Sequence, residues 1–304
     1  MKRILALLAI LQVCLVSSAQ TYSVPFEMAL DTLCMSRFTA VYNYSIRTFD
    51  HNGNEVIDSI LLGVQVGDGY WKCTPYLRVM NVREPKRRFD EVLETEALMH
   101  IETIVSGHPE GKLTIHEAVA PYCYEVVEDK EAIAWTMNDK METICNYACK
   151  GASGEFRGKL WDVMYAEDVP APVGPWKLQG LPGLIMSATD SEGIHSFTLV
   201  GLYTESLPII HENYFVLSIP TEGGGMRPTI KRYEKRTHEQ MVTLRNKIFG
   251  AKVYPSNPQF SFPVFGASDV ETTILNDDCL PNATLINGIT ILGKAHKFQP
   301  LELK

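Results

Sequence analysis

Apolar and polar side chains alternate in the first third of the chain, which is the pattern of half-buried β-strands. Residues 38–47 place aromatic and aliphatic side chains on one face and mostly polar ones on the other, and residues 60–66 repeat this alternation. The dipeptide Asn52-Gly53 between the two runs favours a tight turn. We therefore expect an antiparallel meander in this region.

Two other segments show helical spacing instead. Apolar residues recur every three or four positions over residues 92–105, up to Gly107. Residues 237–240, Thr-His-Glu-Gln, have the form of a capping box ahead of the apolar positions Met241 and Leu244. The sequence therefore predicts one helix over residues 92–105 and a second that begins after Thr237 and ends at Gly250.

Short β-type runs fill the middle of the chain and continue beyond it. They cover residues 113–119, 122–127, 133–137, 143–150, 184–188, 194–201 and 213–219. Glycine-containing turns are expected at residues 151–154 and 190–193, and the second of these would close a hairpin. The predicted fold class is mainly β, with a curved antiparallel sheet, open or half-barrel, and one or two packed helices.

The most distinctive stretch covers residues 156–190 and is predicted to form a strand, an ordered loop and a second strand. Residues 157–165 alternate, so that Arg157 and Trp161 are expected on one face of the first strand. Prolines and glycines then dominate up to residue 183. Leu181-Pro182-Gly183-Leu184 has the residue preferences of a type II turn, because proline sets φ at the second position and glycine accepts a positive φ at the third.

This stretch carries a resemblance to a known family. The structural motif consists of Gly180, Leu181, Pro182, Gly183, Leu184 and Ile185. It is preceded by residues 156–159 (Phe-Arg-Gly-Lys) and 174–177 (Gly-Pro-Trp-Lys), and residues 299–303 (Gln-Pro-Leu-Glu-Leu) stand near the end of the chain. The pattern resembles the GLPGLI family of exported Bacteroidota proteins, although the family pattern has Arg where Lys159 stands. The family supplies no known activity.

The first nineteen residues have the features of a secretory signal peptide. Lys2 and Arg3 precede an apolar run over residues 4–16, and the small residues 17–19 follow. We favour cleavage after Ala19 over lipidation at Cys14, because the branched Val13 stands where a lipidation site needs a small residue. The expected location is the periplasm or the extracellular space. No later apolar run reaches the roughly twenty residues of a spanning helix, so no transmembrane segment is expected in the mature chain.

The net charge limits the classes of binding partner, and the chain length bounds the number of domains. Lys and Arg total 28 against 36 Asp and Glu, a formal net charge of −8, and removing residues 1–19 makes the chain more acidic still. Such a surface repels phosphate backbones, so no nucleic-acid partner is expected. We divide the chain into a signal peptide (1–19), a β-rich domain (20–250) and a C-terminal extension packed on the sheet (251–304).

Six cysteines follow the signal peptide, and an even number in an exported chain suggests disulfides. The candidates are Cys34, Cys73, Cys123, Cys145, Cys149 and Cys279. The sequence leaves their connectivity open. The four-residue separation of Cys145 and Cys149 differs from the spacing of thioredoxin-like redox motifs. Paired or buried structural cysteines are favoured over metal binding.

Standard catalytic patterns are absent from the sequence. It contains no Gly-x-Ser-x-Gly, no His-Glu-x-x-His and no phosphate-binding loop followed by Lys-Ser or Lys-Thr. We interpret His195 as a hydrogen-bonded core or rim residue, and neither His116 nor His211 is expected to bind a metal. No catalytic residue, metal ligand or cofactor is therefore predicted, although a site assembled from distant residues would leave no sequence signal.

The best candidates for ligand binding come from the motif stretch. Arg157, Trp161, Trp176 and Lys177 would combine aromatic surface with two cations, which suits an acidic or carboxylate-bearing ligand. The structural alternative is that Trp176 plugs the end of the sheet, that Lys177 extends over it towards solvent, and that Arg157 pairs with a local carboxylate. We favour the structural alternative.

Three functions are compatible with the sequence. The leading one is a non-catalytic periplasmic or envelope protein that binds an unknown small ligand, peptide or envelope protein. The alternatives are a secreted hydrolase whose site is assembled by the fold, and a metal or redox protein that uses the cysteines. Export together with missing catalytic motifs favours the first of these.

Overall fold

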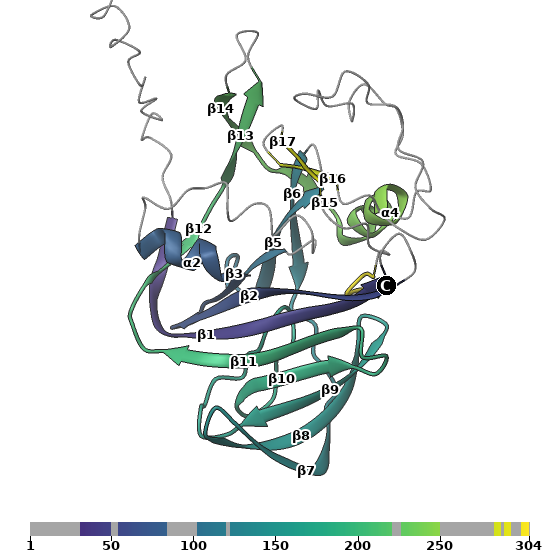
Figure 1. Ribbon diagram of the computed structural model, residues 1–304. Coiled ribbons are helices and arrows are strands. Elements are labelled where there is room, and N and C mark those ends of the chain that lie inside the picture. Colours follow the sequence, from purple (N-terminus) through teal and green to yellow (C-terminus); the bar gives the residue numbers. More distant parts are fainter. Residues whose placement is uncertain are drawn as a thin grey trace, which may run out of the picture. The chain divides into compact units, whose positions relative to one another are not determined.

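One large open sheet carries most of the fold (Figure 1). The structure is a computed structural model, and it describes residues 31–49, 54–83, 102–119, 122–220, 226–249, 283–286, 289–292 and 299–303. The protein is mainly β, and the helices of the described part are α2 (Tyr76–Arg83) and α4 (His238–Phe249). The predicted fold class is therefore confirmed, with the sheet open rather than closed.

The sheet consists of two antiparallel meanders. The first contains β1 (Asp31–Phe49), β2 (Glu55–Gly67), β3 (Trp71–Pro75), β4 (Thr103–Ser106), β5 (Lys112–Val119) and β6 (Tyr122–Asp129). The second contains β7 (Thr136–Ile144), β8 (Tyr147–Phe156), β9 (Lys159–Ala166), β10 (Leu184–Asp190) and β11 (His195–Tyr203). After β6 the chain crosses to the opposite edge of the sheet and returns towards β1.

The two meanders join where β1 pairs with β11. Their register runs from Thr39 opposite Tyr203 to Ile46 opposite His195, so segments far apart in the sequence lie side by side (Figure 1). The short strand β12 (Pro208–His211) also pairs with β1, and β15 (Glu234–Arg236) adds to β6 in parallel. Strands β13 (Tyr214–Pro220) and β14 (Met226–Arg232) form a separate ladder, as do β16 (Ala283–Ile286) and β17 (Ile289–Leu292).

Local sequence signals explain several of these elements. At the N-terminus of α4, the Thr237 hydroxyl accepts from Gln240 N at 3.3 Å, and the Gln240 side chain accepts from Thr237 N at 3.0 Å. The predicted capping box is thereby confirmed. The predicted hairpin between β10 and β11 is also present, and Gly193 supplies its positive φ of 64°.

The core forms where apolar faces of neighbouring strands meet. Tyr44 on β1 stacks on Phe197 of β11 with ring centroids 4.6 Å apart, and Phe197 lies 5.9 Å from the ring of Trp161 on β9. All three side chains are almost fully buried. Each large aromatic ring removes extensive apolar surface from water, so this group ties the first meander to the second.

Several sequence expectations are corrected. Ile104 and Val105 lie in strand β4, not in the predicted helix, whose remaining residues 92–101 lie outside the described residues. The glycines of the turn predicted at 151–154 lie inside β8. A Cβ on Gly154 would approach the Trp135 ring to 2.8 Å, so this glycine permits close packing and makes no turn.

Helix α2 has no counterpart in the sequence prediction. It begins directly after Pro75, and its Val79 is buried against β2. At that contact, a Cβ on Gly63 would lie only 2.8 Å from Val79 Cγ2. Glycine in the strand is therefore what allows the helix to approach the sheet.

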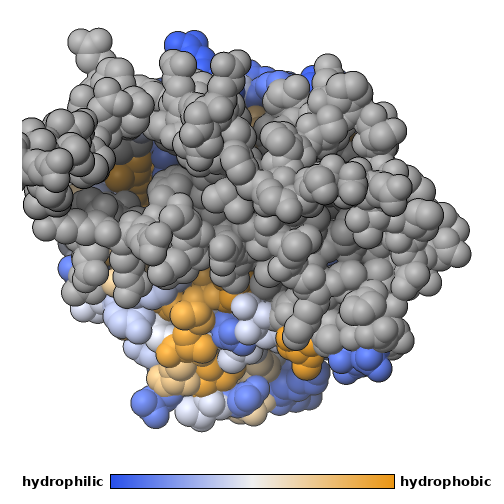
Figure 2. Space-filling model, turned by 45° about the horizontal axis from the view of Figure 1, so that its top comes forward, coloured by the Kyte–Doolittle hydropathy of each residue, from blue (hydrophilic) through white to orange (hydrophobic). Residues whose placement is uncertain are grey.

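The surface of the described part mixes apolar and charged residues. Ile57 on β2, Met141 on β7 and Leu160 on β9 are exposed, so the exposed apolar side chains come from different strands. Figure 2 shows a hydrophobic area beside hydrophilic residues on the coloured part of one face. None of the described helices is long and apolar enough to span a membrane. The predicted boundaries after residues 19 and 250 lie outside the described residues and stay predictions.

Candidate functional site

The motif loop between β9 and β10 is held by backbone hydrogen bonds to itself. Leu184 N donates to Val169 O at 2.9 Å, and Gly180 N donates to Pro172 O at 3.0 Å. The Tyr42 hydroxyl on β1 donates to Ile185 O at 2.7 Å, which anchors the motif to the first meander. The loop is thus an ordered part of the core, as the sequence predicted.

The predicted type II turn at residues 181–184 is wrong. Gly183 is not among the residues with positive φ, whereas Gly180 has a φ of 98°. Glycine is needed at 183 for a different reason, because a Cβ there would overlap the carbonyl oxygen of Ala166. The close approach of two backbone segments therefore explains this glycine.

Trp176 lies within the loop between β9 and β10 and has a strained backbone conformation. Its φ is 54°, a left-handed value that is uncommon for a bulky residue. The indole is buried against Trp161 and Phe156, and its Nε1 donates to Glu102 at 3.3 Å. The Trp176 backbone N also donates to the Cys73 sulfur at 3.4 Å. This placement fits the structural alternative, in which Trp176 fills the end of the sheet.

Lys177 is a fully buried cation surrounded by carboxylates. Its Nζ donates to Glu302 and lies 3.2 Å from Glu128 and 3.9 Å from Glu102. The side chain is only 1% exposed, so the expectation that it extends towards solvent is wrong. An isolated buried ammonium would be very costly, and these three carboxylates compensate for its desolvation.

Two arginines and a histidine extend this buried charge cluster. Arg245 on α4 donates to Glu102 at 3.3 Å and lies 3.6 Å from Glu117 on β5. Arg157 donates to Glu128 at 3.0 Å and to His238 Nε2 at 3.0 Å. The cluster consists of Lys177, Arg157, Arg245, His238, Glu102, Glu117, Glu128 and Glu302.

His238 lies between two carboxylates of the cluster. Its Nδ1 lies 3.2 Å from Glu128 Oε2, and its Nε2 lies 3.2 Å from Glu302 Oε2 and 3.0 Å from Arg157 Nη1. Burial raises the pKa of Glu128, but His238, Lys177 and Arg157 outweigh it and bring this pKa down to about 2. Glu128 is therefore a carboxylate at every pH at which the protein is expected to work.

The pKa values of two buried members are shifted in the cluster. Burial raises the pKa of Glu117 to about 8, against the opposing effect of Arg245, so this carboxyl is mostly protonated at neutral pH. Burial lowers the pKa of Lys177, but Glu102, Glu302 and Glu128 outweigh it and leave the pKa above its ordinary value. Lys177, Arg157 and Arg245 are the lysine and arginine members, and they pair with Glu102, Glu128 and Glu302. Because its pKa is raised, Lys177 stays protonated at neutral pH and cannot act as a nucleophile.

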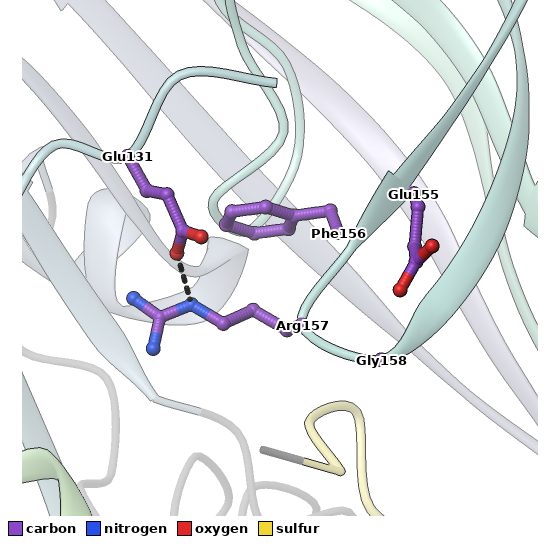
Figure 3. A pocket seen from close by; sticks show the side chains of 5 residues that line it. All are labelled: Glu131, Glu155, Phe156, Arg157 and Gly158. Atoms are coloured by element: carbon purple, nitrogen blue, oxygen red, sulfur yellow. Dashed lines mark ion pairs between the residues drawn. The ribbon is translucent and has the colours of Figure 1, made fainter. Parts of the chain in front are cut away.

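A pocket of about 450 Å³ opens beside the cluster, at the turn between β8 and β9. Arg157 and Gly158 form this turn with φ values of 53° and 83°, which corrects the prediction that Arg157 lies on the strand with Trp161. Figure 3 shows Glu131 and Arg157 pointing toward one another, with the Glu131 oxygen 2.9 Å from Arg157 Nε, while Glu155 lies apart on β8. Phe156 completes the lining.

The four predicted ligand-binding residues therefore have different surroundings. Trp161 and Trp176 are buried in the core, and Lys177 is enclosed by carboxylates. Arg157 is the member of the four that lines the pocket, and it pairs with local carboxylates as the structural alternative expected. Glu302 also belongs to this region, because Leu303 N donates to Arg157 O at 2.9 Å.

The histidines separate into a core residue and a cluster that the sequence did not indicate. His195 is fully buried and its Nδ1 lies 2.8 Å from the Tyr44 hydroxyl, which agrees with its interpretation as a hydrogen-bonded core residue. His116 and His211 come together with Glu125, although 95 positions separate the two histidines. Only the topology of the sheet reveals this group.

The cysteines are free in the described part of the chain. Cys34, Cys73, Cys123, Cys145 and Cys149 form no disulfide, and Cys279 lies outside the described residues. The expected strand over residues 143–150 is interrupted by a turn in which Cys145 has a φ of 50°. Cys149 consequently lies opposite Glu142 in the β7–β8 ladder and faces no cysteine.

Thiol counting is expected to find all five of these cysteines free after unfolding without reductant. In the folded chain, the exposed Cys145 should react first. Burial raises the pKa of Cys73 and of Cys123 to about 12, so both should react only after unfolding, because the thiolate is the reactive form. Mass spectrometry after alkylation identifies each site, and a pair of these cysteines that resists alkylation until reductant is added would contradict the structure.

Comparison with known proteins adds little to this picture. No family model matches the chain. No curated protein matches it. Two solved structures of PNGF-II, in the P21 and C2 space groups, resemble it with TM-scores of 0.44 and 0.42 and sequence identities of 10% and 11%, over 72% of this chain. The chain spans about a third of the length of PNGF-II, since 34% of that chain is covered, and so weak a likeness carries no argument about function.

Proposed function

We propose that this chain is an exported, non-catalytic binding or accessory protein of the GLPGLI type, which acts in the periplasm or at the cell surface. The proposal is supported by the motif stretch, the signal-like first nineteen residues and the way that Lys177 and its neighbours neutralise one another. Its binding site is the pocket at the β8–β9 turn. The main support for the proposed binding role is the charge pattern of that pocket.

The pocket favours a cationic ligand in place of the acidic one that the sequence suggested. The charge of Arg157 is already engaged by Glu128, whose side chain is 9% exposed, and by Glu131. Glu131 pairs with Arg157 but is 55% exposed, and the exposed Glu155 lies apart from that pair, so a ligand can reach both carboxylates (Figure 3). An amine or guanidinium group of a small molecule, a peptide or an envelope protein would complement them.

Affinity capture from native envelope extract tests this function. The wild-type chain is immobilised beside a Glu131→Gln/Glu155→Gln variant, and retained molecules are identified by mass spectrometry. We expect cation-bearing molecules on the wild type and roughly fivefold to tenfold less of them on the variant, because each exposed charge pair contributes up to about 1 kcal/mol. Retention should also fall as salt is added.

A Glu142→Gln variant is the matched control, since Glu142 is an exposed carboxylate on β7 that does not line the pocket. It should retain the same molecules as the wild type. Equal retention by the double variant, or retained molecules that are anionic, would contradict the proposed site. Chemical conversion of a retained molecule by the purified chain would contradict a non-catalytic role.

A further inference from the structure

Two imidazoles and one carboxylate converge on the first meander, away from the pocket residues. His116 on β5 and Glu125 on β6 are direct partners in the antiparallel register, and their Nε2 and Oε2 atoms are 3.2 Å apart. His211 reaches them from the end of β12. One potential ligand atom from each of the three residues lies within 4.8 Å of the other two.

The strand that carries His211 is fixed on both sides of it. Lys72 on β3 donates to Ile210 O at 2.8 Å and to both Glu212 oxygens at 2.8–2.9 Å. The residues before and after His211 are thus bound to one ammonium group, whose side chain is only 5% exposed. One contact holds the Ile210 backbone and the other holds the Glu212 side chain, so the position of His211 is restrained before any ligand binds.

The first histidine is held in place by its own neighbours. The ring of His116 stacks on Tyr233 at a centroid distance of 3.9 Å and an interplanar angle of 7°. Glu125 is held from the other side by Lys235, 3.6 Å from Oε1, which leaves Oε2 facing His116. The His211 ring lies 5.4 Å from that of His116 and 4.5 Å from that of His108.

Two ring nitrogens of this group have no partner in the described part of the chain. Nδ1 of His116 and Nδ1 of His211 are buried and form no hydrogen bond there. Both residues are more than nine-tenths buried. An ion pair between His116 and Glu125 together with ring stacking would account for the packing, but not for two unsatisfied buried nitrogens, since native proteins rarely leave such groups unpaired.

The donor set matches a known coordination chemistry. Two histidines and one glutamate are ligands that zinc accepts in sites with an open fourth position, and the same set binds other divalent first-row metals. Zinc–ligand distances of about 2.1 Å imply separations of about 3.4 Å between ligand atoms in a tetrahedron. The three ligand atoms lie within 4.8 Å of one another, so no pair needs to approach by more than about 1.4 Å to reach that separation.

We propose that His116, Glu125 and His211 bind one divalent transition-metal ion, with Zn²⁺ as the best match, and leave at least one coordination position for water or an exogenous ligand. The ion links β12 to β5 and β6. Such a site goes beyond the binding role of the pocket, because its residues line a different part of the sheet.

Calorimetric titration of the full, chelator-treated chain with Zn²⁺ tests the proposal. We expect one ion per chain and a loss of affinity of about 100-fold or more in Glu125→Gln and in His211→Gln, because removal of a ligand should exceed the 10–100-fold effects of outer-shell changes. Circular dichroism checks that each variant folds. If His211→Gln fails to fold, the Zn²⁺ affinity of Glu125→Gln still tests the proposal. Glu125 is less buried than His211, so its replacement should disturb the fold less.

Co²⁺ substitution separates this site from zinc binding by the free cysteines. Histidine and glutamate ligation gives visible bands without the strong near-ultraviolet charge transfer of a cobalt–thiolate bond, and we expect that spectrum. The Glu142→Gln variant should bind like the wild type. A thiolate band, unchanged affinity in both ligand variants, or no binding of Zn²⁺ at micromolar concentration would each overturn the proposal.

Discussion

Replacement of Lys177 by methionine is expected to destabilise the folded chain by about 3–5 kcal/mol, because it leaves buried carboxylates without their central cation. Glu302, Glu128 and Glu102 all face the Lys177 ammonium, and all three are almost fully buried at the side-chain level. Methionine preserves the length and volume of the aliphatic part. The effect therefore isolates the charge, and urea unfolding followed by circular dichroism measures it.

A surface lysine provides the matched control. Lys150 pairs with Glu167 at 2.7 Å, with about half of each side chain exposed. Lys150→Met should leave the unfolding transition unchanged within error, since solvent screens an exposed pair. The double variant Lys177→Met/Glu302→Gln should be less destabilised than the two single variants added together, because it removes the closest unpaired charge. Equal stabilities for Lys177→Met and the wild type would show that the cluster does not stabilise the fold.

Substitution of Gly183 by alanine is expected to cost about 3 kcal/mol, the upper part of the range for overpacking. The new Cβ would overlap Ala166 O and lie 2.5 Å from Ala166 C. Both are backbone atoms, which cannot move aside as the end of a side chain can. One of the two backbone segments must shift, and the midpoint of urea unfolding should fall accordingly.

Gly201→Ala is the comparison for this variant. Its Cβ would meet the Tyr203 side chain at 3.2 Å, and Tyr203 is about half exposed and free to turn away. We expect a cost below about 1 kcal/mol. If Gly183→Ala were as mild as Gly201→Ala, the close approach of β10 to the end of β9 would not be present in solution.

The sequence predicts this fold well where structure is local. The alternation of residues 38–47 identified β1, and the capping box identified α4, because each depends on neighbours within a few positions. Prediction failed where a strand is formed by pairing with strands that are distant in the sequence. Residues 104 and 105 have helix-compatible spacing, yet β3 and β5 pair with them and make them a strand.

The candidate sites show the same division. The sequence singled out Arg157 and Lys177, but the carboxylates that neutralise them come from β6, from the residue before β4 and from residues near the end of the chain. The sequence does not indicate that His116 and His211 lie close together, because their contact depends on the pairing of β12 with β1. Neither group follows from periodicity or spacing.

The stretches that carry the family resemblance meet in space. Arg157 belongs to residues 156–159, Lys177 to residues 174–177 and Glu302 to residues 299–303. Lys177 binds Glu302, and the Glu302 Oε2 lies 3.8 Å from the Arg157 Nη1. One buried cluster therefore gives a physical reason for three sequence features that are widely separated along the chain.

The pairing of β1 with β11 also constrains the order in which a nascent chain can fold. Residues 39–46 cannot complete their hydrogen bonding until residues 195–203 have emerged. During that interval β1 remains an open edge, and such edges recruit other chains. Because this closure spans so much sequence, folding should be slow, and a chaperone that shields the early meander would benefit it.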